Sequence, residues 1–188
     1  MEAICPFLPA YEKIARVLSQ RGFFKTALGF IDSGLENSPK EEGHDRLHVE
    51  RGVILMRLGK YEDAVSEFDI AIDQIPDDSM GVFRYDSLLK VRALIELGKI
   101  PEIILVFKNL IQKYPSDLVS LNNLGYWYER NGQHDEAADC WKRCLSVDPE
   151  LWSPNASLGM RAKSDNDLAA ATKFFKTSLN NGRFHSVS

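Results

Sequence analysis

The feature that most restricts the fold of this chain is a glycine–proline spacing that occurs four times. The two residues are 17 positions apart in every copy: Gly22 and Pro39, Gly59 and Pro76, Gly98 and Pro115, Gly132 and Pro149. Five positions after each glycine comes Ala27, Ala64, Ile103 or Ala137, and nine positions after it comes Ile31, Phe68, Phe107 or Trp141. Offsets that recur in this way indicate an internal repeat.

The repeat is 34 residues long. Counting back from each glycine places four copies at residues 8–41, 45–78, 84–117 and 118–151, and a fifth fits at 152–185. In the fifth copy Asn166 takes the place of the turn glycine, and in the third Val91, Ile103 and Leu110 replace small residues. Residues 42–44 and 79–83 are extra and lengthen the first two junctions. We therefore expect residues 1–188 to form a single domain of five repeats.

Each copy predicts two helices of about 13 residues joined by a short turn. Glycine or asparagine in the turn tolerates the left-handed backbone that ends a helix. Small residues at the helix crossing permit a close approach, and large apolar residues fill the space between neighbours. In the fifth copy, Ser153-Pro154 predicts an N-cap followed by a proline in the first turn. One repeat cannot bury its apolar face alone, so the predicted fold class is an all-α solenoid.

The chain resembles the tetratricopeptide repeat family over nearly its whole length. Residues 118–151 match the family pattern best, through Leu121, Leu124, Gly125, Tyr128, Gly132, Ala137, Trp141 and Pro149. The resemblance implies a right-handed superhelical solenoid, with a concave groove lined by the first helix of each repeat. It also implies that a partner protein is bound there without catalysis, with the chain acting as an adaptor or scaffold.

The groove positions that the resemblance assigns carry more basic than acidic residues, although the chain has a net charge of −4. The basic ones are Lys13, Arg16, Arg46, Arg57, Arg92, Arg130 and Lys163, against Glu12, Glu50, Glu96 and Glu129. Arginine binds carboxylates bidentately, and exposed tyrosines and asparagine amides suit an extended peptide. We therefore expect an acidic peptide, or one with a free C-terminal carboxylate, to contact Arg57, Tyr85, Arg92, Asn122, Asn123, Tyr126, Arg130 and Lys163.

The carboxylate clamp by which some family members hold heat-shock chaperones is met here only at Asn123. Chaperone binding is therefore not predicted. A second hypothesis is self-assembly into a dimer or an end-to-end structure, because the last helix is apolar at Leu168, Ala171, Phe174, Phe175 and Leu179. Either that helix caps the solenoid, another copy covers it, or the chain belongs to a longer protein. The amino-terminal Ile4, Phe7 and Leu8 offer a further apolar surface.

Catalysis has only remote support. The pairs His44-Asp45 and His134-Asp135 are the one hint of a metal-dependent hydrolase, and both fall at expected junctions or turns. Cys140 and Cys144 share a helix face. We expect them to be two small, partly buried residues and not metal ligands. We predict no enzyme activity, no metal and no cofactor.

Composition restricts the partners and the compartment. The acidic isoelectric point, near 5.6, argues against nucleic acid, because a surface that follows phosphates is usually basic. No stretch approaches the roughly 20 apolar residues of a membrane span, and the amino terminus does not resemble a secretory signal. With three cysteines, including Cys5, there is no disulfide framework. We expect a cytoplasmic protein that does not insert into membranes.

Overall fold

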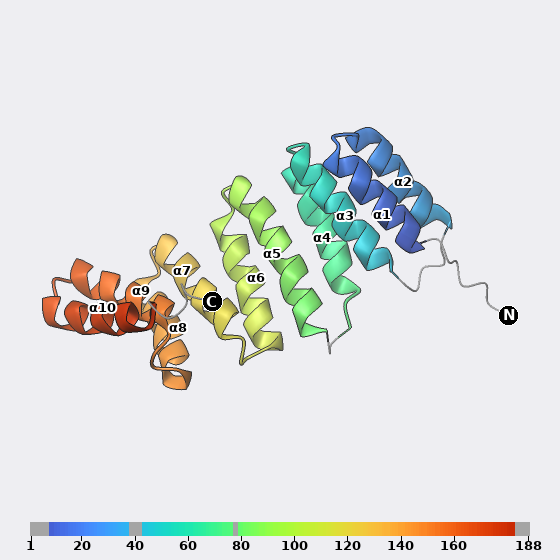
Figure 1. Ribbon diagram of the computed structural model, residues 1–188. Coiled ribbons are helices and arrows are strands. Elements are labelled where there is room, and N and C mark those ends of the chain that lie inside the picture. Colours follow the sequence, from blue (N-terminus) through green and yellow to red (C-terminus); the bar gives the residue numbers. More distant parts are fainter. Residues whose placement is uncertain (1–7, 38–42, 77–78, 183–188) are drawn as a thin grey trace. The chain divides into compact units, whose positions relative to one another are not determined.

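The computed structural model describes residues 8–37, 43–76 and 79–182. These residues form ten α-helices and no strand: α1 Leu8–Gln20, α2 Phe24–Asn37, α3 His44–Arg57, α4 Tyr61–Asp73, α5 Met80–Glu96, α6 Ile100–Lys113, α7 Leu118–Arg130, α8 His134–Val147, α9 Trp152–Ser164 and α10 Leu168–Gly182 (Figure 1). The predicted all-α helical repeat is confirmed. Ile4, Cys5, Phe7, Pro39, Glu42 and the end of the fifth copy, residues 183–185, lie outside the described residues.

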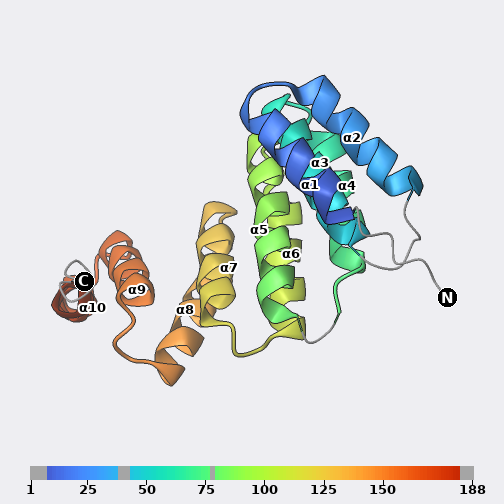
Figure 2. The ribbon, with the colours of Figure 1, turned by 45° about the vertical axis from the view of Figure 1, so that its right-hand side comes forward.

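The helices belong to two compact halves. The amino-terminal half extends to Lys99 and holds α1 to α5, and the carboxy-terminal half begins at Ile100 and holds α6 to α10. In the first half α1 packs on α2 and α3 packs on α4, while α3 also contacts α1 and α5. In the second half α7 packs on α8 and α9 on α10, and α9 also contacts α7 (Figure 2). Within each half, the first helices of consecutive repeats are therefore neighbours.

The turn inside each repeat has the same backbone form in all five copies. Gly132, for example, has φ 78°, and its neighbour Gln133 donates its N–H to the Tyr128 carbonyl oxygen at 2.9 Å. Asn166, which takes the place of the glycine in the last copy, has φ 62°. The second helix then begins two residues later, at Phe24, Tyr61, Ile100, His134 and Leu168. The predicted left-handed turn is confirmed.

Glycine at the helix crossing allows the two helices of a repeat to touch. A Cβ atom on Gly125 would lie 2.6 Å from Nε1 of the buried Trp141 indole. Gly52 and Gly159 meet large aromatic rings in the same way. The first repeat has a different pair: Ala15 on α1 and Ile31 on α2, both buried. Isoleucine is smaller than the aromatic residue that the other repeats have at this position. The predicted close packing at this position is confirmed.

Three helix starts differ from the expected pattern. Gly43 is the N-cap of α3, which begins at His44, and Ser79 is the N-cap of α5, which begins at Met80. Most of the extra residues therefore lengthen a first helix and not a junction. The prediction that Ser153 caps the last repeat is wrong, because Leu151 is the N-cap and α9 begins at Trp152. Pro154 does lie in the first turn, as predicted.

Candidate partner-binding face

The residues expected to bind a partner lie on the first helices of the repeats. We call this surface the first-helix face. In the carboxy-terminal half it is formed by Asn122, Asn123, Tyr126 and Arg130 on α7 and by Lys163 on α9. In the amino-terminal half the predicted residues are Arg57 on α3 and Tyr85 and Arg92 on α5. Each half has its own group of predicted residues.

Arg130 and Tyr126 contact each other on the face. Residues four apart lie on one side of a helix, and here Arg130 Nη1 donates a hydrogen bond to the Tyr126 hydroxyl at 3.2 Å. The guanidinium also lies 5.9 Å from the centre of the Tyr126 ring and 6.0 Å from that of Trp127. The ring of Tyr126 is 46% exposed and packs edge-on against Trp127. These contacts hold the guanidinium in place and leave most of its N–H donors available to a carboxylate.

The two asparagines have different environments. The Asn122 side-chain amide donates to Ser153 Oγ at 3.1 Å, which joins α7 to α9. Ser153 is the second residue of α9 and so lies inside the helix, and its hydroxyl is bonded to the neighbouring repeat. Asn123 is half-buried and makes no side-chain hydrogen bond within the described residues. Asn123 is therefore the asparagine whose whole amide group is free to bind a peptide backbone.

Glu129 on α7 is an acidic residue of the face in this half, and basic side chains surround it. Arg161 Nη1 lies 3.8 Å from Glu129 Oε1, and its Nη2 lies 3.0 Å from Asp165 Oδ1. His134 Nδ1 is also 3.0 Å from Glu129, although the two atoms do not meet hydrogen-bond geometry. Lys163 is exposed and has no ion pair within the described residues. Arg130 and Lys163 are therefore the two face cations in this half whose charge is not offset by a paired carboxylate.

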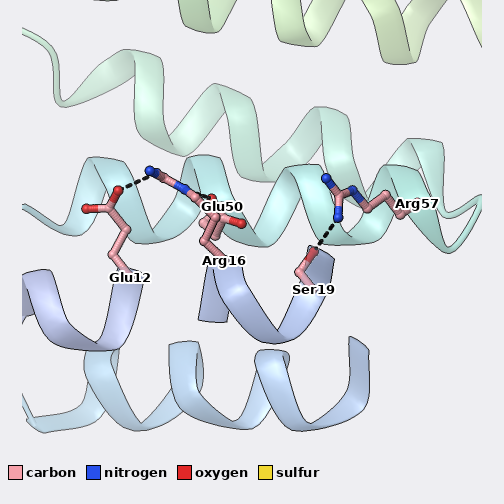
Figure 3. A network of polar contacts seen from close by, with 5 residues as sticks. All are labelled: Glu12, Arg16, Ser19, Glu50 and Arg57. Atoms are coloured by element: carbon pink, nitrogen blue, oxygen red, sulfur yellow. Dashed lines mark hydrogen bonds and ion pairs between the residues drawn. The ribbon is translucent and has the colours of Figure 1, made fainter. Parts of the chain in front are cut away.

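The amino-terminal half contains a polar network that neutralises one expected cation (Figure 3). Arg16 Nε donates to Glu50 Oε2 at 3.1 Å, and the same guanidinium pairs with Glu12 on its own helix. Because Glu50 is buried, this pairing satisfies a carboxylate that would otherwise be costly to bury. The positive excess counted along the face is thus smaller than the residue types alone indicate.

The three predicted residues of this half remain exposed. Arg57 Nη1 donates to the buried Ser19 hydroxyl at 3.0 Å, a contact between α3 and α1 (Figure 3). Tyr85 is 61% exposed, and Arg92 is exposed two helical turns further along α5. A spacing of seven residues keeps Tyr85 and Arg92 on one side of the helix.

A second concave surface was not anticipated from the sequence. A cavity of about 550 Å³ lies on the carboxy-terminal half, lined by residues of α6, α7 and α8. Its apolar lining includes Ile111, Leu124 and Tyr128, and Asp135 and Asp139 supply carboxylates. Leu124 and Tyr128 are positions of the repeat pattern. Their spacing therefore predicted that they pack between helices, and it did not indicate a cavity.

The two cysteines and the two histidines that the sequence singled out on α3 and α8 lie in different surroundings. Cys140 and Cys144 are buried, and burial raises the pKa of each thiol to about 11. Both are therefore protonated and unreactive at neutral pH. His44 and His134 are each the first residue of a helix, α3 and α8. The described part of the chain contains no group of three or more potential metal ligands.

Comparison with known proteins agrees with this geometry. The family model for the tetratricopeptide repeat matches residues 119–151. The protein CTR9 homolog of Arabidopsis thaliana is 25% identical in an alignment of 181 positions, which covers 87% of this chain and 16% of that protein. This chain thus spans about a sixth of the length of that relative.

Two solved structures share the fold. Residues 41 to the end of MamA from Desulfovibrio magneticus RS-1 superpose with a TM-score of 0.71 at 21% identity, covering 99% of this chain and 100% of the other. YrrB, described as a TPR protein with an unusual peptide-binding site, gives a TM-score of 0.63 at 16% identity, covering 91% and 84%. The chain has the tetratricopeptide repeat fold, and its residues 119–151 are a tetratricopeptide repeat by sequence. Among the described helices, none combines the length and apolar character needed to cross a bilayer.

Proposed function

We propose that this chain is a non-catalytic adaptor that binds a segment of a partner protein on the first-helix face. The observation that carries the proposal is the group on α7 in which Tyr126 and Arg130 are exposed and in contact with each other and Asn123 is half-buried with an unbonded amide. Tyrosine and arginine are the residue types most often dominant in protein interfaces. The solved structure of YrrB, which has the same fold, is described as having a peptide-binding site.

The partner segment that we propose is acidic or ends in a free carboxylate. Arg130 is held by Tyr126 before any partner arrives, so less side-chain entropy is lost on binding. Arg57, Arg92 and Lys163 add positive charge at other points of the face. We also propose that the five repeats act as one domain, and that the chain works in the cytoplasm, where the free thiols of Cys140 and Cys144 would stay reduced.

A comparison of two baits in native lysate tests the proposal. The first variant is Arg92→Ala, Asn123→Ala, Arg130→Ala. The matched control also removes two cations and one asparagine, but from the second helices: Lys25→Ala, Asn109→Ala, Lys142→Ala, all exposed. A partner held by the wild type and by the control, and lost from the first variant, supports the proposal. A partner retained by all three proteins would place binding elsewhere and would refute it.

Self-association is a second candidate function, favoured by the exposed apolar residues of α10. Leu168 and Leu179 are 63% and 65% exposed, and their spacing of eleven residues puts them on one side of the helix. An exposed apolar row of this kind is a typical contact between copies. Sedimentation at increasing concentration tests it: the mass should rise for the wild type and stay monomeric for Leu168→Ser/Leu179→Ser. A monomer at every concentration rules this function out.

A further inference from the structure

The first-helix face of the carboxy-terminal half carries exposed apolar side chains as well as positive charge. Tyr126 on α7 is 46% exposed, and Met160 on α9 is 65% exposed although the preceding Leu158 and Gly159 are buried. Tyr126 and Met160 are 34 residues apart and so occupy the same position in consecutive repeats. We call these two residues the apolar pair. Apolar side chains gathered on a surface are typical of a contact with another molecule.

Two polar contacts hold α7 and α9 next to each other, one on each side of the apolar pair. Near the helix starts, the Asn122 amide donates to Ser153 Oγ at 3.1 Å. Near the helix ends, Arg161 Nη1 lies 3.8 Å from Glu129 Oε1. The contacts follow the same order along both helices, so α7 and α9 run in the same direction. Each member of the apolar pair falls between the two contacts in sequence, and the pair therefore lies at one level of the face.

The two cations without a paired carboxylate lie one helical turn beyond the apolar pair. Arg130 follows Tyr126 by four residues, and Lys163 follows Met160 by three. Three or four residues are about one turn, or about 5 Å along the helix axis. Because α7 and α9 run in the same direction, both cations lie on the same side of the apolar pair. This part of the face thus has an apolar row and, beside it, a cationic row.

The charges of α7 and α9 do not cancel. The two helices contain three cations, Arg130, Arg161 and Lys163, against one carboxylate, Glu129, which leaves a net charge of +2. Arg161 pairs with Glu129 and with Asp165, which follows α9, and Glu129 also lies 3.0 Å from a histidine of α8. The carboxylates of this part of the face therefore already have basic neighbours. Arg130 and Lys163 are left to select a ligand with negative charge.

We propose that this part of the face binds an extended internal segment of the partner in which apolar and acidic residues alternate. The inference rests on the proposed function and specifies its ligand. Successive side chains of an extended chain point to opposite sides. A segment that crosses α7 and α9 between the two rows therefore directs its apolar residues to one row and its carboxylates to the other. Alternate residues are about 7 Å apart, which allows one apolar and one acidic residue for each helix.

The side chains of the two rows fit these ligand groups. Methionine is flexible and adapts to apolar side chains of different shapes, and the Tyr126 ring offers a flat surface. Arg130, held by Tyr126 through a hydrogen bond of 3.2 Å, presents its donors to one carboxylate, and Lys163 presents its ammonium group to a second. A C-terminal carboxylate alone would satisfy only one of these two cations. The two rows therefore favour an internal segment over a chain end.

Two peptides of identical composition test the proposal. The first has the alternating order Gly-Leu-Glu-Leu-Glu-Gly, and the second has the block order Gly-Leu-Leu-Glu-Glu-Gly. Both are acetylated and amidated, so neither carries a terminal charge. A third peptide, Gly-Leu-Gln-Leu-Gln-Gly, keeps the alternation and removes the carboxylates. Titration of the isotope-labelled protein, followed by the NMR shifts of its backbone amides, gives the affinity and the place of binding together.

We expect the alternating peptide to bind at least about fivefold more tightly than the block peptide, because only the alternating order brings both leucines to the apolar row. The glutamine peptide should bind about fivefold to tenfold more weakly than the alternating one, because two ion pairs of modest individual effect are lost. The alternating peptide should shift the amides of Tyr126, Met160 and Lys163, and should leave that of Val147 at the end of α8 unchanged.

A pair of protein variants tests the apolar row. Met160→Ser should weaken binding of the alternating peptide about fivefold, because apolar contact area is lost. The melting temperature should stay the same, because the Met160 side chain is mostly exposed. The matched control is Val147→Ser, which removes an apolar side chain that is 68% exposed on α8 and should leave the affinity unchanged.

Three results would overturn the inference. The first is no binding of the alternating peptide at millimolar concentration, and the second is equal binding of the alternating and block peptides. The third is an equal affinity of Met160→Ser and Val147→Ser for the alternating peptide. The proposed function is judged separately by the comparison of baits in lysate, where Met160 is unchanged. Equal binding of both peptides, with shifts at Tyr126 and Arg130, would contradict the alternation and leave an acidic partner standing.

Discussion

Replacing Gly125 with alanine should destabilise the protein, although alanine is the better helix former. The added Cβ atom would lie 2.6 Å from Trp141 Nε1, 2.9 Å from Cδ1 and 3.0 Å from Cε2. The indole is only 3% exposed, so it cannot move aside into solvent. Forcing an extra carbon into such a contact costs about 3 kcal/mol, at the upper end for overpacking. The higher helix propensity of alanine offsets about 1 kcal/mol of this.

The net expectation is a loss of about 2 kcal/mol of unfolding free energy, or about 4–8 °C in the melting temperature of a chain this long. Circular dichroism at 222 nm, followed during heating and during urea titration, measures the change. Gly29→Ala is the internal control, because Gly29 is exposed within α2 and a Cβ there would meet no atom within 4 Å. That variant should gain up to about 1 kcal/mol from helix propensity alone.

A double variant isolates the contact from other effects. The first repeat already combines alanine with isoleucine at this crossing, as Ala15 and Ile31. Trp141→Ile alone should cost about 3 kcal/mol for lost burial. Combined with Gly125→Ala it should cost about 2 kcal/mol, because the smaller side chain leaves room for the new methyl group and the gain in helix propensity remains. Additive losses, or a Gly125→Ala variant as stable as the wild type, would refute the reasoning.

Three further predictions concern other sites. Burial, and then the charge of Asp45, raises the pKa of Asp86 from 3.8 to about 6, so unfolding free energy should fall as the pH rises from about 4 through 6. Asp86→Asn should abolish that fall and gain about 3 kcal/mol at pH 8, measured by urea titration at both ends of the range. Asn166 has φ 62°, so Asn166→Gly should be neutral or slightly stabilising and Asn166→Ala should cost about 1 kcal/mol in the same assay. Arg130→Lys should weaken binding of the captured partner about tenfold with an unchanged melting temperature, since lysine lacks the planar donor fork held by Tyr126.

The turns, and with them the starts of the second helices, were predictable because they depend on local backbone geometry. A residue with positive φ is needed wherever a helix reverses into its partner, so the recurrence of glycine fixed the register of the repeats. The same logic holds for Asn166, since asparagine is the usual alternative to glycine in this conformation. The crossing residues Gly125 and Trp141 followed from the register, because their offsets are constant.

Features that depend on contacts between repeats were not predictable from the spacing. The hydroxyl of Ser153 bonds to Asn122, 31 residues earlier, and α9 begins one residue before Ser153, so this serine lies inside the helix and does not cap it. The Arg16 guanidinium is hydrogen-bonded to Glu50, 34 residues later. Counting basic residues at the groove positions therefore overstated the positive charge that is free to bind a partner. The cavity near Tyr128 is formed by three helices, and no single stretch of sequence contains it.

The partner-binding role of the first-helix face is tested most directly by site-specific photo-crosslinking. A benzophenone amino acid would replace Tyr126, which is 46% exposed on that face, or Lys142, which is exposed on α8. The account predicts that the captured partner is crosslinked in good yield from position 126 and not from position 142, through an acidic or C-terminal peptide. Crosslinking from position 142 alone, or only between copies of this chain, would contradict it.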